Sequence, residues 1–442
     1  MTDPNTARRL AALIERRDAT VGVIGLGYVG LPLSLTFAEG GFRVLGFDTD
    51  PAKIDALRLG RSYVGHLGDR RVADAVASHR FEATGDLGRL GEPDALLICV
   101  PTPLRDGHQP DLRYVEATVA AIARRLRRGQ LVVLESTTYP GTTEELVLPA
   151  LAAGGPRCGE DFFLAFSPER ENPGDEDHST RTIPKVVGGA DAVSGDLAEA
   201  LYGAVVKRVV RVSSPRVAEA AKLTENVFRG VNIALVNELK TIYDRMGIDV
   251  WEVLDAAATK PFGFMRFTPG PGWGGHCIPV DPFYLAWKAR RHGGEARFIE
   301  LAGVINTEMP RWVIAKLEAA LASRGQALRG ARVLLLGLAY KPNVDDPRES
   351  PAFELLELLL EAGAVPGYHD PHVPVVPVMR SWPALPALRS VALDAAELGR
   401  HDAAIVVTAH DAIDWKLVAE AAPLVIDTRG VYREPRANVV RA

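Results

Sequence analysis

Residues 21–30 read Val-Gly-Val-Ile-Gly-Leu-Gly-Tyr-Val-Gly, a short apolar run that leads directly into three glycines at positions 25, 27 and 30. The apolar run has the length and composition of a buried β-strand, and residues 30–39 continue as a helical pattern. A strand, a glycine-rich turn and a helix in this order form the first step of a parallel sheet that helices cover on both faces. We therefore predict an α/β architecture for the N-terminal part of the chain.

The spacing of these glycines is typical of a dinucleotide-binding turn. In such a turn the first glycine permits the tight bend, the second lets backbone amides touch a pyrophosphate, and the third lets helix and strand pack closely. A purely structural glycine turn is the alternative interpretation. The predicted cofactor-binding residues of the turn are Gly25, Gly27, Tyr28, Val29 and Gly30.

The second predicted strand, at 43–48, ends in an acid that bears on the choice of cofactor. Asp48 lies 18 residues after Gly30. A carboxylate there suits the two ribose hydroxyls of NAD and would repel the 2′-phosphate of NADP. Lys53 would lie on the adenosine side, although an ordinary solvated lysine is the plainer interpretation. We predict NAD as the cofactor.

The remaining patterns divide the chain into three domains. Strand and helix patterns alternate over 1–210, helical patterns alone fill 211–322, and alternation resumes over 323–442. This predicts two doubly wound, Rossmann-like domains joined by a helical central domain with a long connecting helix. The predicted strands lie at 21–24, 43–48, 95–100, 131–135, 162–167, 332–337, 365–368, 403–408 and 424–427. The predicted helices lie at 30–39, 111–125, 143–152, 215–244, 350–361 and 298–322, the last interrupted only by Pro310.

Polar residues follow several predicted strands, at the edge where open α/β sheets bind ligands. Thr102, Ser136 and Thr137 follow the third and fourth strands, so their hydroxyls are candidates to face the nicotinamide half of the cofactor. Each hydroxyl alone is more often an ordinary cap. Glu169 follows the fifth strand and is a candidate to order water or to act as a base.

A glycine-rich, proline-bounded loop holds one of the three cysteines of the chain. Residues 270–282 read Gly-Pro-Gly-Trp-Gly-Gly-His-Cys-Ile-Pro-Val-Asp-Pro. Asp281 is a good helix N-cap and Pro282 suits the first helical position. Cys277 would therefore lie just before a helix N-terminus, where the dipole favours a thiolate able to form a covalent intermediate. A small hydrophobe in a tight turn is the alternative.

Two further groups of residues are candidates to contact a second ligand. Lys222, Asn226 and Arg229 are spaced by four and three, so they share one helix face, on which Lys222 and Asn226 could stabilise a developing oxyanion. A solvated helix face is the alternative. Lys341 and Arg348 follow the first strand of the C-terminal domain, in a crevice suited to a phosphate-bearing ligand.

Composition excludes several classes of protein. The 442 residues carry a net charge of −5 and no long basic run, which argues against nucleic acid or an anionic membrane as a partner. No apolar stretch approaches the length of a membrane span, and the N-terminus lacks a signal-peptide core. Three cysteines in this length are typical of a cytoplasmic protein rather than of a disulfide framework. We predict no metal site.

Together these motifs resemble the UDP-glucose/GDP-mannose dehydrogenase family over nearly the whole chain, from Val21 to about Arg429. The resemblance implies an NAD-binding N-terminal domain, a helical dimerisation domain, and a C-terminal domain that binds the UDP part of a UDP-sugar. It also implies a homodimer or higher homo-oligomer, and a four-electron oxidation of a sugar C6 alcohol to a carboxylate with two NAD⁺. The markers are the turn at 25–30, Val-Pro-Thr-Pro at 100–103, Ser-Pro-Glu at 167–169, Lys-Leu-Thr-Glu-Asn at 222–226, the loop at 270–282, and Lys-Pro-Asn-Val-Asp-Asp-Pro-Arg at 341–348.

The resemblance also implies roles for the residues that match these motifs. Cys277 would add to the C6 aldehyde, lose hydride as a thiohemiacetal and leave a thioester. Asp281, with Thr137, would hold and activate the water that hydrolyses this thioester. The implied catalytic residues are Cys277, Lys222, Asn226, Asp281, Glu169 and Thr137. The implied substrate-binding residues are Glu169, Lys222, Asn226, Arg266, Gly274, Lys341 and Arg348.

The residues beside the cysteine bear on the identity of the sugar. UDP-glucose dehydrogenases usually carry Ser before the cysteine and Lys before the aspartate, whereas this chain has His276 and Val280. The loop is more similar to the branch that acts on 2-acetamido sugars. The flanking segments, Lys-Pro-Phe-Gly-Phe-Met at 260–265 and Trp-Lys-Ala-Arg at 287–290, resemble enzymes that act on UDP-N-acetylglucosamine, which makes it the favoured substrate, with UDP-N-acetylmannosamine and UDP-glucose as alternatives. Arg266 is the nearest candidate for an arginine that reaches the partner subunit's site in UDP-glucose dehydrogenases, but its spacing to Cys277 differs.

Two functions of other classes remain open from the sequence. A two-electron dehydrogenase of the 3-hydroxy-acid type also joins a dinucleotide domain to a helical one and uses a lysine, but it needs neither a second α/β domain nor a nucleophilic cysteine. A non-enzymatic protein that senses NAD would need no catalytic set, so Lys222, Cys277 and Asp281 argue against it.

Overall fold

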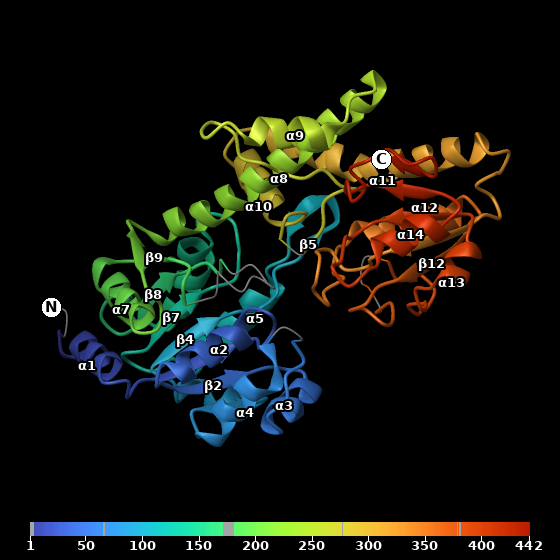
Figure 1. Cartoon of the computed structure of the whole chain (residues 1–442). Helices are drawn as coiled ribbons and strands as arrows, with labels where there is room; N and C mark the ends of the chain where they lie inside the picture. The colour runs from blue at the N-terminus through green and yellow to red at the C-terminus, as the bar shows by residue number, and fades with distance from the viewer. Residues whose placement is uncertain (1–3, 65–66, 171–180, 276, 378, 380–381) are drawn as a thin grey trace. The chain divides into compact units, whose positions relative to one another are not determined.

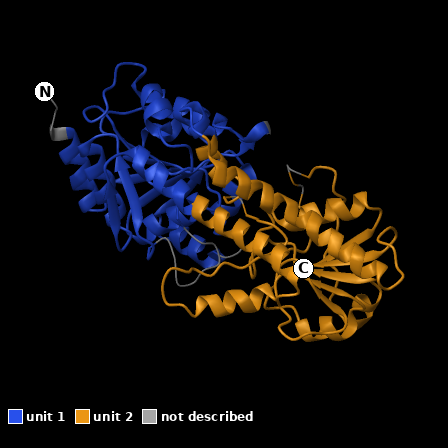
Figure 2. Ribbon diagram, turned by 90° about the horizontal axis from the view of Figure 1, so that it is seen from above, with its two compact units in different colours: residues 1–225, 287–294 blue, residues 226–286, 295–442 orange. Residues whose placement is uncertain are grey.

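The computed structural model describes residues 4–64, 67–170, 181–275, 277–377, 379 and 382–442 (Figure 1). The chain divides into two compact units (Figure 2). Unit 1 comprises Met1–Glu225 and Trp287–Gly294, and unit 2 comprises Asn226–Ala286 and Glu295–Ala442. Within the described residues, no helix is long and apolar enough to cross a membrane.

Unit 1 is built on an eight-stranded sheet in the order β10-β9-β8-β7-β4-β1-β2-β3. Its strands are β1 (Thr20–Ile24), β2 (Arg43–Phe47), β3 (Phe81–Thr84), β4 (Ala95–Ile98), β7 (Leu131–Leu134), β8 (Phe163–Phe166), β9 (Lys185–Gly189) and β10 (Val209–Val212). The strands from β8 to β3 pair in parallel. Strand β9 pairs antiparallel with β8, and β10 runs parallel to β9. The long parallel part confirms the predicted α/β class.

Helices cover both faces of this sheet because alternate residues of each strand point to opposite sides. Val21 and Val23 belong to one buried cluster, whereas Ile24 belongs to another on the opposite face. The first cluster includes residues of α1 (Pro4–Glu15), α2 (Gly30–Glu39), α3 (Pro51–Arg58), α4 (Asp69–Ala77) and α7 (Ala192–Gly203). The second includes residues of the 3₁₀ turn η2 (Leu87–Gly91), α5 (Arg113–Ala123), the π-helical turn η4 (Thr143–Val147) and α6 (Leu148–Ala152).

The connections of unit 1 reverse direction at one point in the sheet. Strands β2 and β3 lie on one side of β1, whereas β4, β7 and β8 lie on the other. Open α/β sheets bind their ligands at such a switch point, outside the carboxyl ends of the strands. The glycine-rich turn begins at the carboxyl end of β1, so the topology places it at this point (Figure 1).

Unit 2 contains a second, smaller parallel sheet in the order β12-β11-β13-β14-β15. Its strands are β11 (Arg332–Leu336), β12 (Val365–His369), β13 (Ala403–Val406), β14 (Val425–Asp427) and β15 (Val439–Arg441). Two buried clusters again lie on opposite faces. Residues of α11 (Arg297–Ala322) and α12 (Pro351–Glu361) belong to one, and residues of α13 (Ala395–Gly399) and α14 (Trp415–Ala421) belong to the other.

The middle of the chain is helical, as predicted. It contains α8 (Pro215–Met246), α9 (Val250–Ala258), α10 (Asp281–Arg291) and α11. The prediction that Pro310 interrupts the last of these helices is wrong, because α11 is continuous and buries this proline. A proline in a helix leaves the carbonyl four residues earlier without its helical partner. Here that carbonyl belongs to Asn306, and it lies 3.3 Å from where a Cβ on Gly272 would stand.

Strand ends and small elements are where sequence and structure differ most. Several predicted strands are one or two residues too long. The structure also contains elements that the sequence patterns did not predict. They are β3, β9, β10, β15, α1, α3, α4, α7, α9, α13, α14 and the hairpin of β5 (Leu104–Arg105), the 3₁₀ turn η3 (Asp106–His108) and β6 (Gln109–Pro110).

Candidate active site

The glycine-rich turn of unit 1 has the sterics of a dinucleotide site. Gly25 has a φ of +91°, and a Cβ there would lie 2.5 Å from the Cys99 carbonyl oxygen. A Cβ on Gly30 would lie 1.8 Å from the Gly25 carbonyl oxygen. A Cβ on Gly27 would meet no atom within 4 Å. Two glycines are therefore required by the protein itself, whereas the middle one keeps the backbone open to a ligand.

Asp48 follows β2 beside this turn. One of its carboxylate oxygens accepts a hydrogen bond from the Leu26 amide at 2.9 Å, and Lys53 Nζ lies 3.4 Å from the same oxygen. The Tyr63 hydroxyl donates to the Leu26 carbonyl. Burial raises the pKa of this tyrosine, and Asp48 raises it further. Tyr63 was missed by the sequence analysis, because no motif marks it.

The predicted hydroxyls lie at the carboxyl edge of the same sheet. Ser136 donates to the carbonyls of Ile98 and Val100 at 3.1 and 2.8 Å, so it joins the ends of β7 and β4. Thr102 and Thr137 are half-buried. Because the Ser136 hydroxyl donates its proton to these two carbonyls, it can interact with the cofactor only by accepting a hydrogen bond.

Glu219 anchors the start of the long helix α8 within unit 1. Its buried carboxylate accepts hydrogen bonds from the Gly141 and Thr143 amides at 2.5 and 2.9 Å, and from the Thr143 hydroxyl at 2.7 Å. Burial raises the pKa of Glu219, and the bond from the Thr143 hydroxyl opposes that rise. Lys222 stands three residues later on the same helix and is half-buried. Because the Glu219 bonds fix this part of α8 against Gly141 and Thr143, they also restrict the position of Lys222 within unit 1.

In unit 2 two predicted catalytic residues from different motifs are joined by a hydrogen bond. The Asn226 side-chain amide donates to a carboxylate oxygen of Asp281 at 2.6 Å, and both side chains are buried. The Cys277 carbonyl accepts the Val280 and Asp281 amides at 3.1 and 2.8 Å. Asp281 is the first residue of α10 rather than a residue before it, a difference of one position from the prediction.

The ring of Tyr340 packs on the cysteine loop within unit 2. A Cβ on Gly275, whose φ is +87°, would lie 3.0 Å from this ring, and a Cβ on Gly274 would lie 3.3 Å from Tyr340 Cβ. Burial raises the pKa of Tyr340 to about 12, with further contributions from Asp346 and Cys277. The sequence predicts that these glycines let a ligand approach the backbone. Their contacts with protein are a second reason for glycine at both positions.

A buried polar cluster holds the first residue of the cysteine loop. The Gly270 amide donates to Asn237 Oδ1 at 2.9 Å, and the Gly270 carbonyl accepts Lys240 Nζ at 2.9 Å. Asn237 also donates to Asn306 Oδ1 at 2.8 Å, which links α8 to α11. Burial lowers the pKa of Lys240 well below its usual value, with a further contribution from Arg429. The sequence did not indicate this cluster, because its members lie far apart along the chain.

We expect Asn237→Ala to lower the free energy of unfolding by about 2–4 kcal/mol, because it leaves the Gly270 amide and the Asn306 oxygen unpaired in a buried site. Asn232→Ala is a matched control on the same helix, since its side chain bonds only to the Phe228 carbonyl of that helix. We expect it to change stability by less than about 1 kcal/mol. Denaturant unfolding measures both, and equal losses would contradict the role of the cluster.

The remaining predicted substrate residues also lie in unit 2. Arg348 forms a bidentate ion pair with buried Asp346, in which Nε donates to Oδ1 at 2.8 Å and Nη2 donates to Oδ2 at 2.6 Å. Lys341 is half-buried in the same loop after β11. Arg266 binds Asp255 of α9 at 2.7 Å and the Thr268 hydroxyl at 2.9 Å, within its own chain. His276 lies outside the described residues.

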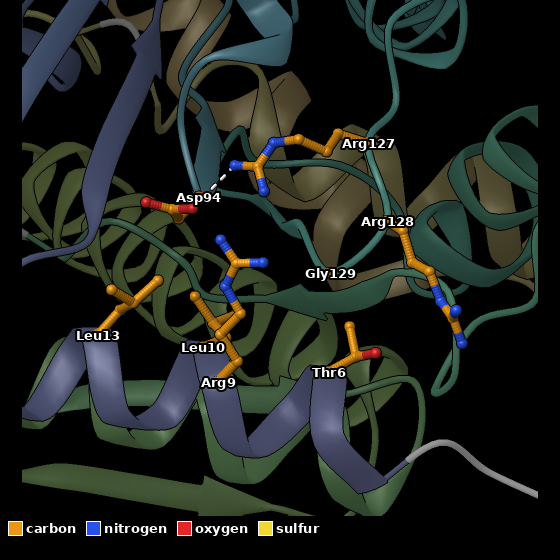
Figure 3. A pocket seen from close by; sticks show the side chains of 8 residues that line it. All are labelled: Thr6, Arg9, Leu10, Leu13, Asp94, Arg127, Arg128 and Gly129. Atoms are coloured by element: carbon orange, nitrogen blue, oxygen red, sulfur yellow. Dashed lines mark hydrogen bonds and ion pairs between the residues drawn. The ribbon is translucent and has the colours of Figure 1, made fainter.

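None of the predicted site residues lines a cavity of about 280 Å³ in unit 1 (Figure 3). Its lining includes Asp94, which precedes β4 and is bonded to Arg127, and Gly129, which precedes β7. These are the amino ends of the strands, whereas ligands of such sheets bind at the carboxyl ends. We therefore do not assign the substrate to this cavity. Among the described residues, no group of three or more His, Cys, Asp or Glu could hold a metal ion.

Comparison with protein families gives three matches in chain order. The NAD-binding domain of the UDP-glucose/GDP-mannose dehydrogenase family matches residues 19–206. The central domain of this family matches residues 216–308, and its UDP-binding domain matches residues 334–434.

Individual relatives match nearly the whole chain. The UDP-N-acetyl-D-glucosamine 6-dehydrogenase of Pseudomonas aeruginosa is 38% identical over 396 residues, which is 89% of this chain and 91% of the relative. The structure of the UDP-D-ManNAc dehydrogenase of Pyrococcus horikoshii matches with a TM-score of 0.86 and 32% identity, and it covers 96% of this chain and 98% of its own. The NDP-N-acetyl-D-galactosaminuronic acid dehydrogenase of Methanosarcina mazei matches with a TM-score of 0.79 and 31% identity, with 98% and 97% covered.

Proposed function

Because this chain belongs to the UDP-glucose/GDP-mannose dehydrogenase family, we propose that it oxidises the C6 alcohol of a UDP-linked 2-acetamido sugar to the carboxylate. The chain is an NAD-dependent oxidoreductase that acts on a UDP-sugar. UDP-N-acetylglucosamine is the favoured substrate. Support comes from the relatives, which are named for N-acetylglucosamine, N-acetylmannosamine and N-acetylgalactosaminuronic acid.

The residues of the glycine turn fit the NAD that the family implies. Gly27 leaves the backbone open for a pyrophosphate, and the Asp48 carboxylate stands beside the turn to accept ribose hydroxyls. Lys53 would contact the adenosine side while it stays near Asp48. When bound, NAD⁺ accepts hydride from carbon, and oxidation of an alcohol to an acid requires two equivalents.

Cys277 is the proposed nucleophile, because a covalent tether keeps the aldehyde in place between the two oxidations. Oxidation of the alcohol removes two electrons and leaves an aldehyde, to which the thiolate adds. Oxidation of the resulting thiohemiacetal removes two more and leaves a thioester. Water then attacks the thioester carbon, supplies the second carboxylate oxygen and regenerates the thiol.

The observation that carries this proposal is the hydrogen bond from Asn226 to Asp281. Asp281 lies at the N-terminus of α10, the helix that follows Cys277. Asp281 is acceptor-only when ionised, so it can hold a water by accepting its proton. The bond from Asn226 fixes the orientation of this carboxylate. The amide of Asn226 keeps its second N–H, which can donate to an oxygen that gains charge.

Further residues complete the proposed set from the family resemblance. Lys222 stabilises the oxygen that gains charge, Thr137 helps to hold the water, and Glu169 is the acid or base for hydrolysis. Substrate contacts come from Gly274, Lys341, Arg348 and Arg266.

A homodimer or higher homo-oligomer also remains a proposal. Phe228 and Leu235 lie seven residues apart on α8, and each is 49% exposed. Phe298, at the start of α11, is 78% exposed. Exposed large apolar side chains such as these are typical of an interface between subunits.

Incubation with NAD⁺ and a panel of UDP-sugars tests the proposed reaction. We expect two NADH for each sugar consumed, and a product mass that corresponds to the carboxylic acid. The panel contains UDP-N-acetylglucosamine, UDP-N-acetylmannosamine, UDP-N-acetylgalactosamine and UDP-glucose, and we expect the first to give the highest kcat/KM. One NADH per sugar would indicate a two-electron dehydrogenase instead. A strong preference for UDP-glucose would contradict the 2-acetamido assignment.

A further inference from the structure

A buried lysine in unit 1 lies between two carboxylates. Lys185 Nζ lies 2.7 Å from Glu135 Oε2 and 3.2 Å from Glu169 Oε2. Lys185 is 3% exposed and Glu135 is 1% exposed, whereas the Glu169 side chain is 14% exposed. Of these three side chains, only Glu169 is therefore appreciably exposed to solvent.

The antiparallel strand β9 explains how these residues meet. Its register pairs Ala165 with Gly189 and Phe166 with Gly188. If this register is continued three residues forward from Phe166 and three residues back from Gly188, position 169 comes opposite position 185. Glu135 follows β7, the neighbour of β8 on its other side. The lysine thus begins its strand at the same sheet edge where both glutamates end theirs.

Glu135 has a partner for each of its oxygens. Lys185 binds one, and the Tyr202 hydroxyl donates to the other. Burial raises the pKa of Glu135, and the ammonium of Lys185 opposes that rise. For Lys185 burial lowers the pKa, but the two carboxylates more than offset this and raise it overall. The cluster thus holds two carboxylates and one ammonium, of which Glu135 and Lys185 are buried and Glu169 is partly exposed.

Other charged and titratable groups face this cluster from the elements around it. The Arg170 amide donates to Glu169 Oε1 at 2.6 Å, while its guanidinium binds Glu225 of α8 at 2.6 and 3.2 Å. The charges of Arg170 and Glu225 therefore largely cancel. Cys99, after β4, has its pKa raised by burial first and by Glu135 second, so its thiol stays neutral. The ammonium of Lys185, 3.2 Å from Glu169 Oε2, thus offsets the charge of this carboxylate.

We propose that Lys185 is a positioning residue that keeps Glu169 ionised and oriented for acid–base work in the proposed hydrolysis. This inference rests on the proposed function, which gives Glu169 its role. Because a single ammonium is shared by two carboxylates, Lys185 and Glu135 act in opposite senses on the charge of Glu169. Loss of the lysine charge leaves two like charges together, whereas loss of the Glu135 charge leaves the lysine to Glu169 alone.

The experiment is the pH profile of acid formation for the wild type, Lys185→Met and Glu135→Gln. A base acts only when it is ionised, so activity falls as the pH drops through its pKa. We expect the acidic limb of kcat/KM to move to higher pH by about one unit or more in Lys185→Met, and to lower pH in Glu135→Gln. Glu169→Gln should remove this limb, which assigns it to Glu169.

Lys185→Arg retains the charge and should keep the limb near its wild-type position, with thermal unfolding as the test that each variant folds. If Lys185→Met does not fold, Glu135→Gln and Lys185→Arg still give the two expected outcomes. If the wild type forms acid, two results would overturn the inference. One is an acidic limb that stays in place in both Lys185→Met and Glu135→Gln, and the other is a limb that moves in the same direction in both. A wild type that forms no acid would overturn the proposed function, and this inference with it.

Discussion

Cys277→Ala is expected to abolish formation of the carboxylic acid, with a loss of at least about 10³-fold in kcat. Without the sulfur no thiohemiacetal or thioester forms, so oxidation stops at the aldehyde. The fold should persist, because the structural role of this residue is carried by its backbone carbonyl, which accepts the Val280 and Asp281 amides. We expect the free energy of unfolding to change by no more than about 1 kcal/mol. Product mass and NADH stoichiometry measure the effect.

Cys158→Ala is the matched control for this variant. Cys158 is also half-buried, but it lies in unit 1, where its sulfur is 3.4 Å from an Asp191 carboxylate oxygen. We expect acid formation to continue at close to the wild-type rate. Acid formed by Cys277→Ala at the wild-type rate would contradict covalent catalysis. An equal loss in both variants would point to a general effect of cysteine removal.

Gly30→Ala is expected to destabilise unit 1 by about 1–3 kcal/mol or more, and to remove most NADH binding. The new Cβ would stand 1.8 Å from the Gly25 carbonyl oxygen and 3.2 Å from Cys99 Cβ. A backbone atom cannot rotate away as a flexible side chain can, so the turn itself must shift. Thermal unfolding and NADH fluorescence titration measure the two effects.

Gly27→Ala separates ligand binding from stability in the same turn. A Cβ there meets no protein atom within 4 Å, so we expect thermal unfolding to change little. If the pyrophosphate lies against this backbone, a clash of about 1–3 kcal/mol would weaken NADH binding by roughly 5- to 150-fold. Unchanged binding in Gly27→Ala would show that the pyrophosphate lies elsewhere. A Gly30→Ala protein that melts and binds as the wild type does would contradict the steric argument.

Long, local patterns were the features that the sequence predicted well. The helix at 30–39 has the predicted bounds, and α8 extends only two residues beyond its predicted end. These patterns succeed because an apolar stripe of period 3.6 and a glycine turn are encoded within one short segment. The continuity of α11 through Pro310 could not be predicted, because the cost of a proline in a helix depends on what packs around it.

Short elements were missed for a related reason. Strand β9 reads Lys-Val-Val-Gly-Gly, and two glycines in five residues weaken any strand pattern. Its place is fixed by antiparallel pairing with β8. The consequence for the candidate site is large, because this pairing alone brings Lys185 to Glu169.

The order of motifs along the chain was enough to predict the α/β fold, the NAD cofactor and the family, since each motif encodes its own turn and its own chemistry locally. Other features arise only when distant segments pack together. Asn237 meets Gly270 across 33 residues, and Lys185 meets Glu135 across 50. Such contacts depend on strand register and helix packing, and the buried partners then set which carboxylates are ionised. The identity of the reacting groups is therefore local information, whereas their orientation and charge are properties of the folded chain.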